Sequence, residues 1–373
     1  MRRSIPRISD LPLEDRIAQL FVVGFEGTEV TDDLQALLEE RGFGGVIVFA
    51  RNVKSAPQLK RLCGRIAALD TALPPIISVD QEGGPVMRLR VPPFTPWPAA
   101  GDVARYAART GDMKTLRDLG QAMGRELAAV GIHWNFAPVL DVNTNPRNPV
   151  IGVRAFGSRP IDVSRLALAV ERGLRSAGIL STGKHFPGHG DTIDDSHISL
   201  PRVKRSARSL SRMELAPFRA AVRARIPALM TAHVLYPAWD HKRPATFSPE
   251  ILQGILRKRL GFRGAIVTDD LSMAGARRGR TIEEASFQAL AAGADVLLIC
   301  HDPGAQRRAH RYLVDRAKRG ELSEKRINEA LRRVIALKRR YVAGDGRKRR
   351  PALSRVGHPA HGKIVARILS DKK

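Results

Sequence analysis

The chain has 373 residues, 43% of them hydrophobic, and its 63 Lys and Arg residues against 37 Asp and Glu residues give a formal net charge of +26. This apolar content, arranged in regular segments, excludes a disordered chain and suffices for a sizeable core. The two cysteines, Cys63 and Cys300, exclude a disulfide framework and a four-thiolate zinc site.

Short apolar runs alternate with amphipathic segments along the whole chain. We predict eight strands from these runs, at residues 21–26, 45–50, 76–81, 133–142, 179–186, 228–236, 265–270 and 296–302. Helical spacing predicts helices at 31–41, 56–69, 116–130, 161–177, 213–224, 248–260 and 282–292, and another at 323–341 after the last strand. Four of these helices are followed by a glycine, which is a common helix stop: Gly131, Gly178, Gly261 and Gly293.

The alternation of buried strands with helices predicts an α/β fold, a single (β/α)8 barrel that covers residues 1–341. A doubly wound open sheet is the alternative, but no G-x-G-x-x-G sequence follows an early strand, and Gly83-Gly84 is only a doublet. Residues 342–373 are expected to form a basic C-terminal extension, with a linker at 342–353 and a closing helix at 357–369.

The positive charge raises affinity for any polyanion, so nucleic-acid binding has to be considered. The basic residues are spread along the chain, and only residues 347–350 form a compact cluster. Aromatic residues make up 5% of the chain, too few for the stacking platforms of a single-strand binder. A basic nucleic-acid-binding protein therefore stays as an alternative function, and no specific nucleic-acid partner is expected.

Membrane and export segments are not predicted. No apolar run approaches the roughly 18 residues of a membrane-spanning helix. The basic N-terminus has no apolar stretch behind it, so it does not resemble a secretory signal. We expect a cytoplasmic protein without a membrane span.

Ionisable residues stand where the predicted strands end. In a barrel of this kind the carboxyl ends of the strands meet at one rim, where the reactive residues lie. The polar residues at these positions are Asp80, Glu82, Asp141, Asn143, Lys184, His185, His233, Asp269, Asp270, His301 and Asp302. Any one of them could cap a helix or face solvent, but the whole set predicts an active site.

The densest set lies in the segment 184–201, Lys-His-Phe-Pro-Gly-His-Gly-Asp-Thr-Ile-Asp-Asp-Ser-His-Ile-Ser-Leu-Pro. Its prolines and glycines predict a long irregular loop. One use of the loop is acid–base chemistry: in Asp195-Ser-His197 the carboxylate can fix the ring tautomer and leave the other nitrogen to exchange a proton. The alternative is a metal-dependent hydrolase, because the spacings are compatible with metal ligands among His185, His189, Asp191, Asp195 and His197.

A second candidate is the pair Asp269-Asp270 at the end of the strand predicted at 265–270. A carboxylate at a barrel mouth is well placed to act as a nucleophile, although Asp269 could instead cap Asp270 or the next helix. Arg88, Arg154 and Lys184 supply cations. Cations beside carboxylates suit the binding of sugar hydroxyls.

Four stretches resemble the bacterial β-N-acetylglucosaminidases of glycoside hydrolase family 3. They are Val79-Asp-Gln-Glu-Gly-Gly84, Asn148-Pro-Val-Ile-Gly-Val-Arg154, the loop 184–201 and Val267-Thr-Asp-Asp-Leu-Ser-Met273. The resemblance runs from about residue 12 to about residue 341. It looks closest to the short, single-barrel cytoplasmic branch that acts in peptidoglycan recycling.

The resemblance implies a role for each matching residue. Asp269 matches the catalytic nucleophile of the family, His197 its histidine general acid/base, and Asp195 the partner of that histidine. The residues that match those holding the terminal N-acetylglucosamine are Asp80, Arg88, Arg154, Lys184 and His185.

One position departs from the family pattern. Pro85 stands where many relatives have a basic residue after the two glycines, which puts the shape of the loop that presents Arg88 in doubt. The spacing from Asp80 to Arg88 is unchanged.

The resemblance therefore implies a retaining exo-β-N-acetylglucosaminidase that releases N-acetylglucosamine from the anhydro-muramyl partner in muropeptides, through a covalent glycosyl-enzyme. It implies no cofactor and no metal, a small-molecule amino-sugar substrate as the partner, and we expect a monomer. A histidine acid/base is also compatible with phosphate as the acceptor, so phosphorolysis stays open beside hydrolysis.

Overall fold

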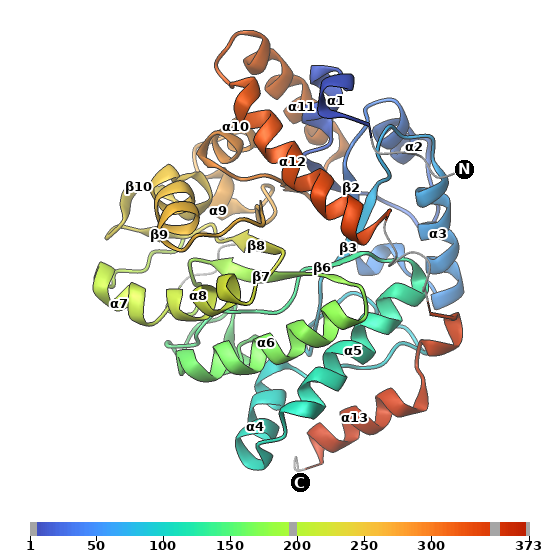
Figure 1. Cartoon of the computed structure of the whole chain (residues 1–373), viewed down its shortest axis with the longest axis vertical. Helices are drawn as coiled ribbons and strands as arrows, with labels where there is room; N and C mark the ends of the chain where they lie inside the picture. The colour runs from blue at the N-terminus through green and yellow to red at the C-terminus, as the bar shows by residue number, and fades with distance from the viewer. Residues whose placement is uncertain (1–5, 194–199, 344–350, 371–373) are drawn as a thin grey trace.

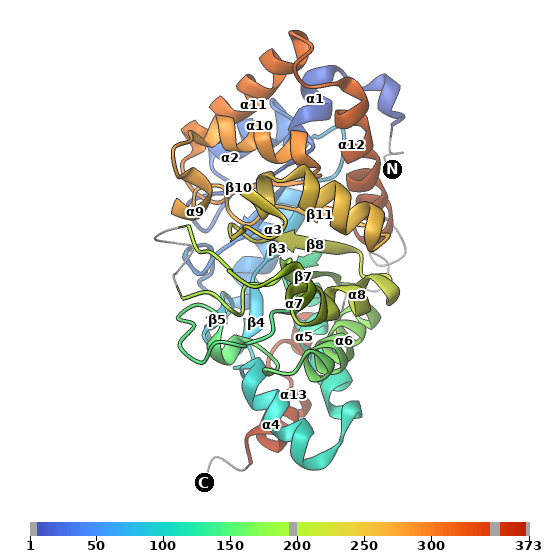
Figure 2. The same cartoon turned by 90° about the vertical axis from the view of Figure 1, so that its left-hand side faces the viewer.

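A computed structural model describes residues 6–193, 200–343 and 351–370 of the chain. Its centre is a sheet of eight strands surrounded by helices (Figure 1, Figure 2). In chain order the strands are β1 (Phe21–Gly24), β2 (Gly45–Val48), β3 (Ile76–Val79), β6 (Trp134–Asn135), β7 (Leu180–Phe186), β8 (Ala228–Thr231), β11 (Ala265–Val267) and β12 (Leu297–Ile299). Neighbouring strands are parallel, in the order β11-β8-β7-β6-β3-β2-β1-β12.

The sheet closes between its two end strands, β11 and β12. An isolated parallel bridge joins Val267 to Val296, and the Thr268 N–H donates to the Val296 carbonyl at 3.0 Å. The predicted (β/α)8 barrel is therefore confirmed, and the alternative of an open doubly wound sheet is wrong. All residues of β1, β2, β3 and β8 are buried, which explains their continuous apolar runs.

Helices cover the outside of the barrel. In chain order they are α1 (Leu13–Ala18), α2 (Asp32–Glu39), α3 (Ala56–Ala68), α4 (Ala100–Thr110), α5 (Met113–Val130), α6 (Pro160–Ser176), α7 (Ala207–Arg212), α8 (Leu215–Arg223), a π-helix (Glu250–Arg259), α9 (Ala274–Arg277), α10 (Ile282–Ala292), α11 (Pro303–Lys318), α12 (Glu324–Tyr341) and α13 (Pro359–Leu369). Two short hairpins, β4 (Gln81–Gly83) with β5 (Val86–Met87) and β9 (Leu235–Tyr236) with β10 (Asp240–Pro244), stand outside the barrel sheet. None of the helices in the described ranges is long and apolar enough to cross a bilayer.

The strand predicted at 133–142 differs most from its prediction. Only Trp134 and Asn135 form β6, and pairing resumes in a single bridge between Val139 and Lys184. Pro138 has no N–H to donate to a neighbouring strand, which explains the interruption. The chain is therefore irregular where it reaches the rim of the barrel.

Two long helices, α4 and α11, lie where the sequence predicted none. The buried face of α11 consists of Ala305, Gln306, Ala309, His310, Leu313 and Val314, and most of these residues are small or polar. Such a face produces a weak apolar period in an arginine-rich segment, so the pattern does not reveal the helix. The predicted helix at 213–224 is shorter in the structure, because α8 covers only Leu215–Arg223 and leaves Met213, Glu214 and Ala224 outside it.

The described part of the C-terminal extension packs on the barrel. Helix α13 lies beside α4 and α5 (Figure 1), where His361 Nδ1 is 2.8 Å from Glu126 Oε1 and the His361 ring lies 5.7 Å from the Trp97 ring. The Gly357 N–H donates to the same glutamate oxygen at 2.9 Å. The division into residues 1–341 and 342–373 stays a prediction.

Candidate active site

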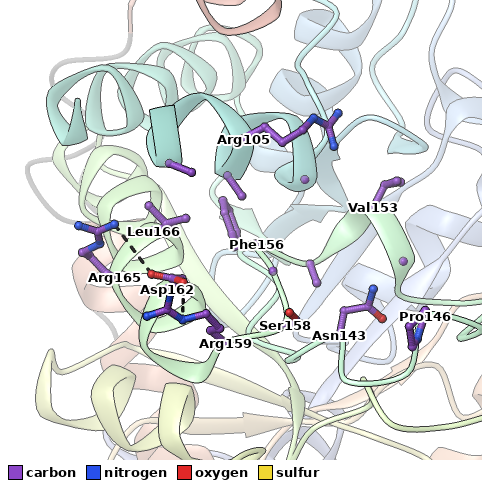
Figure 3. A pocket seen from close by; sticks show the side chains of 16 residues that line it. Arg105, Asn143, Pro146, Val153, Phe156, Ser158, Arg159, Asp162, Arg165 and Leu166 are labelled. Atoms are coloured by element: carbon purple, nitrogen blue, oxygen red, sulfur yellow. Dashed lines mark ion pairs between the residues drawn. The ribbon is translucent and has the colours of Figure 1, made fainter. Parts of the chain in front are cut away.

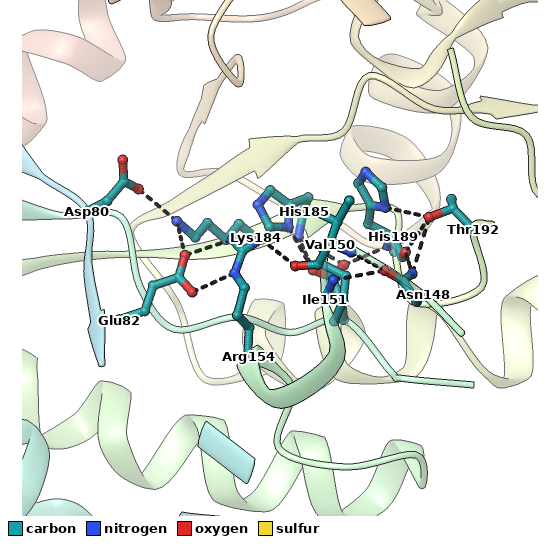
Figure 4. Close-up of polar contacts among 12 residues, drawn as sticks. Asp80, Glu82, Asn148, Val150, Ile151, Arg154, Lys184, His185, His189 and Thr192 are labelled. Carbon is teal, nitrogen blue, oxygen red and sulfur yellow. Dashed lines mark hydrogen bonds and ion pairs between the residues drawn. The ribbon is translucent and has the colours of Figure 1, made fainter. Parts of the chain in front are cut away.

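The sugar-binding residues implied by the resemblance lie at the carboxyl ends of neighbouring barrel strands. Asp80 follows β3, Lys184 is in β7, and Arg154 ends the short helix Gly152–Arg154 after β6. Figure 4 shows these three side chains directed toward one another and toward Glu82 of β4. We call Asp80, Glu82, Arg154 and Lys184 the Lys184 cluster.

Lys184 is the centre of this cluster. Its side chain is 3% exposed, and Nζ donates to Asp80 Oδ1 at 2.8 Å and lies 2.6 Å from Glu82 Oε1. Burial alone would lower the pKa of Lys184, but the charges of the two carboxylates outweigh burial and raise it. Lys184 is therefore a fixed cation at the rim of the barrel.

Glu82 is the member of the cluster whose role was not predicted. Arg154 donates to it through Nη2 at 2.8 Å and Nε at 2.9 Å. Burial alone would raise the pKa of Glu82, but Lys184 and Arg154 hold it far below its usual value. Alternate residues of an extended chain point the same way, so the spacing from Asp80 to Glu82 is the signal that could have found this role.

Arg88 approaches the same cluster from the hairpin of β4 and β5. Its Nη2 lies 3.6 Å from Asp80 Oδ2, and its backbone N–H donates to Gln81 Oε1 at 2.9 Å. Its Nε is buried and has no hydrogen-bond partner among the described residues. The hairpin forms with Pro85 in its turn, so the departure from the family pattern leaves Arg88 at the site.

His185 is oriented by Asp141, another residue whose role was not predicted. Asp141 Oδ2 lies 2.7 Å from His185 Nδ1, and Asp141 Oδ1 accepts the His189 N–H at 2.7 Å. Burial alone would raise the pKa of Asp141, but the two histidines outweigh burial and lower it. Burial lowers the pKa of His189 to about 4, so this ring is neutral at physiological pH.

The two acids after β11 have different environments. Asp270 Oδ1 accepts the backbone N–H groups of Ser272 at 3.0 Å and Cys300 at 3.1 Å, so this carboxylate holds the shape of the loop. Asp269 Oδ1 accepts the Asp270 N–H at 2.8 Å. This local contact orients Asp269 through one of its two carboxylate oxygens.

Asp269 shares one electrostatic environment with the sugar-binding residues. Burial alone would raise the pKa of its carboxyl group, but the charges of His185, His233 and Lys184 outweigh burial and lower it. His233 in turn lies 3.1 Å, through Nε2, from the Asp270 carbonyl oxygen. Asp269 is thus an ionised carboxylate at the mouth of the barrel.

The loop after β7 is irregular, as predicted, and its start is closely packed. A Cβ at Gly190 would lie 1.7 Å from the Val142 carbonyl oxygen, and a Cβ at Gly188 would lie 2.7 Å from the Glu214 Cβ. Close packing therefore requires both glycines. The predicted acid/base His197 and its partner Asp195 lie outside the described residues, and their roles stay predictions.

The metal alternative gains no support from the described part of this loop. Its three described members each contact another residue: His185 contacts Asp141, His189 contacts Thr192, and Asp191 contacts an arginine. Within residues 6–193, 200–343 and 351–370, no three His, Cys, Asp or Glu side chains form a group that could hold a metal ion. The other two proposed ligands lie outside these ranges.

Glu214 is fully buried beneath the loop, just before α8. Neither of its carboxylate oxygens has a hydrogen-bond partner among the described residues, and Arg205 Nε lies 3.7 Å from Oε1. Burial raises the pKa of Glu214 to about 7, although Arg205 opposes the shift. The folded protein therefore keeps this side chain protonated over a wider pH range than the unfolded chain does.

Replacing Glu214 with Gln is expected to make stability less dependent on pH. Because the pKa is about 7 in the folded state against a usual 4.5, the parent loses stability as the pH rises between these values. The variant should therefore gain roughly 2–3 kcal/mol over the parent between about pH 5 and about pH 8 in urea unfolding. A Glu321→Gln control, at a half-exposed glutamate paired with Arg316, should give the same difference from the parent at both pH values. Parallel behaviour of the two variants would contradict the prediction.

A cavity of about 890 Å³ lies beside the Lys184 cluster rather than within it. Figure 3 shows its lining from α4, α6 and the loop after β6, with Asn143 and Phe156 at its wall. Gly152 and Val153 line this cavity, whereas Arg154, the next residue, binds Glu82 in the cluster. The short helix Gly152–Arg154 therefore contributes residues both to the cavity and to the Lys184 cluster.

Sequence comparison identifies one family over most of the chain. A model of the glycosyl hydrolase family 3 N-terminal domain matches residues 12–337. A β-hexosaminidase from Alkalilimnicola ehrlichii is 43% identical over 296 residues, which cover 79% of this chain and 84% of that protein.

Solved structures agree with this match. A glycoside hydrolase family 3 β-N-acetylglucosaminidase from Paenibacillus superposes with a TM-score of 0.89 at 38% identity, covering 96% of this chain and 68% of that chain. NagZ from Neisseria gonorrhoeae, in complex with N-trifluoroacetyl-D-glucosamine, superposes with a TM-score of 0.80 at 34% identity, covering 94% of this chain and 98% of that chain.

Proposed function

The chain belongs to glycosyl hydrolase family 3, and from this premise we propose that it is a retaining exo-β-N-acetylglucosaminidase. Its family and its β-hexosaminidase relatives make it a glycoside hydrolase with β-N-acetylhexosaminidase activity. The finer proposal rests on the position of Asp269: it follows β11 at the barrel mouth, its Oδ1 accepts the Asp270 N–H at 2.8 Å, and the charges of His185, His233 and Lys184 lower the pKa of its carboxyl group.

Retention of configuration requires a carboxylate nucleophile on one face of the sugar and an acid/base on the other. In the first step an oxygen of Asp269 bonds to the anomeric carbon while the bond to the aglycone breaks, and His197 gives its proton to the leaving oxygen. In the second step His197 takes a proton from water, the water oxygen bonds to the anomeric carbon, and Asp269 leaves as a carboxylate. An unperturbed histidine titrates near neutral pH, which suits both proton transfers. Asp195 orients the His197 ring in this scheme.

The Lys184 cluster, Arg88 and His185 are the groups proposed to hold the terminal N-acetylglucosamine. The buried Nε of Arg88, which has no partner among the described residues, supports this role because an unpaired buried donor is costly until a ligand oxygen accepts from it. Arg154 acts through Glu82, since two of its nitrogens donate to that carboxylate and a third donates to the Val150 carbonyl oxygen at 3.0 Å.

The proposed substrates are muropeptides, whose N-acetylglucosamine is released during peptidoglycan recycling in the cytoplasm by a monomeric enzyme. The net charge of +26 supports an anionic substrate, because a positive surface attracts the carboxylates of a peptide stem at low salt. The relatives that carry the NagZ name support the same branch of the family.

The test is covalent trapping followed by peptide mapping. The fluorine of a 5-fluoro N-acetylglucosaminyl reagent slows both steps, whereas a good leaving group on the reagent speeds only the first, so the glycosyl-enzyme accumulates. We expect the label on Asp269 and no label in an Asp269→Asn variant. Label on another carboxylate, or turnover without a covalent species, would contradict the proposed mechanism.

A further inference from the structure

An ion pair joins the two sides of the loop that follows β7. Arg205 Nε donates to Asp191 Oδ2 at 2.7 Å, and Arg205 Nη2 donates to Asp191 Oδ1 at 2.7 Å. This geometry uses the planar guanidinium fork on both carboxylate oxygens. Asp191 precedes the segment 194–199 and Arg205 follows it, and the proposed acid/base His197 belongs to that segment.

The N-terminal part of this loop, which includes Asp191 and Thr192, is held by the chain after β6. Thr144 Oγ1 donates to Asp191 Oδ1 at 3.0 Å, and Asn145 Nδ2 donates to the Thr192 carbonyl at 3.0 Å. The Asn145 N–H also reaches the Gly190 carbonyl at 3.3 Å. These contacts place Asp191 relative to the rim of the barrel.

The C-terminal part of this loop, residues 201–205, is held by β9. The Leu235 N–H donates to the Pro201 carbonyl at 2.9 Å, and the Val203 N–H donates to the Leu235 carbonyl at 3.0 Å. Arg205 follows this pairing directly. Beneath it, the buried Glu214 lies 3.7 Å from Arg205 Nε, so two carboxylates face one guanidinium.

We propose that Arg205 is a positioning residue for the acid/base step of the reaction. Its fork joins Asp191 to Arg205 on the two sides of the segment that carries His197, so it limits how far the two sides of the loop can move apart. The inference rests on the proposed function, in which His197 is the acid. In this proposal Arg205 acts through its contact with Asp191 and not directly on the sugar.

The test uses the dependence of the rate on the leaving group. The quantity kcat/KM reports the steps up to departure of the aglycone, and a dinitrophenyl group leaves without a proton whereas a phenyl group needs one. For Arg205→Ala we expect kcat/KM to fall at least about tenfold more for the phenyl than for the dinitrophenyl N-acetylglucosaminide. Arg205→Lys keeps the charge but not the fork, so it should fall between the parent and Arg205→Ala.

Arg316→Ala is the matched control. Arg316 is 31% exposed and pairs with Glu321 outside the site, whereas Arg205 is 33% exposed. The control should affect both substrates alike. Equal losses on the two substrates for Arg205→Ala, or no loss, would overturn the inference.

Covalent labelling distinguishes a positioning role of Arg205 from a folding defect of the variant and from a failure of the proposed function. If Arg205→Ala still reacts covalently at Asp269 with the 5-fluoro reagent, its sugar site is intact. A selective loss of kcat/KM on the phenyl substrate then reports impaired proton donation to the leaving oxygen. If the parent itself does not label at Asp269, the proposed function fails and the result does not concern Arg205.

Discussion

Replacing Asp269 with Asn is expected to lower kcat for an aryl N-acetyl-β-glucosaminide by about 10⁴-fold, because the variant has no carboxylate to form the glycosyl-enzyme. Asparagine keeps the shape of the side chain and an oxygen that accepts the Asp270 N–H, which Asp269 accepts at 2.8 Å. The fold should therefore survive, and the loss should be in the chemical step. Steady-state kinetics with a para-nitrophenyl substrate measures it.

Two comparisons sharpen this prediction. Asp270→Asn removes the neighbouring charge but keeps an acceptor for the N–H groups of Ser272 and Cys300, so we expect a much smaller loss. In Asp269→Ala, added azide should occupy the space of the carboxylate and form the α-glycosyl azide by a single inversion. A larger loss for Asp270→Asn, or a β-azide product, would contradict the assignment of Asp269 as the nucleophile.

Replacing Lys184 with Met is expected to cost about 3–5 kcal/mol of stability, because it removes the buried cation that Asp80 and Glu82 share. Nζ of Lys184 lies 2.8 Å from Asp80 and 2.6 Å from Glu82 in a side chain that is 3% exposed. Lys184 also helps to lower the pKa of Asp269, so its loss should move the acidic limb of the pH–rate profile to higher pH. We expect kcat/KM to fall about 100-fold or more, because sugar binding and the nucleophile are affected together.

The chain offers a matched control in Lys338, which is also fully buried. Nζ of Lys338 donates to the neutral Gln19 side chain at 2.5 Å, and burial lowers the pKa of Lys338 to about 7. Lys338→Met leaves no buried carboxylate behind, so it should be neutral or stabilising and leave activity unchanged. Equal destabilisation by the two substitutions would show that burial of a lysine, and not its pairing in the Lys184 cluster, decides the effect.

A double-substitution cycle separates charge from packing at this site. Adding Glu82→Gln to Lys184→Met removes one of the two carboxylate charges that Lys184 paired with and leaves Arg154 with a neutral partner. The double variant should be more stable than the sum of the two single effects predicts.

The barrel was predictable because a parallel strand covered on both faces needs a continuous apolar run, and such runs are visible in the sequence. The long helix α12 was predictable for a similar reason: Ser323 precedes a regular apolar period, and its Oγ accepts the Arg326 N–H at 3.3 Å. Helix α11 was not, since small and polar residues fill much of its buried face. Strand β6 was predicted too long because burial alone does not distinguish a strand from irregular chain around Pro138.

The residues of the candidate site were likewise predictable only in part. In a barrel of this kind reactive residues lie at the carboxyl ends of the strands. Asp80, Lys184 and Asp269 stand at such positions, so the sequence alone identified them as candidates. It did not reveal the part that Glu82 plays, because that part depends on Lys184 and on Arg154, which lies 72 residues away along the chain.

What the sequence determined by itself is the barrel, the rim on which reactive residues stand and the family motifs. These follow from local periodicity and from short stretches of chain. What only the tertiary structure decided is which charges meet: Lys184 with Asp80 across 104 residues, and Arg205 with Asp191 around the loop. The physical reason is that Coulomb energies and pKa values depend on distance and burial in the folded state, and neither can be read from the order of residues.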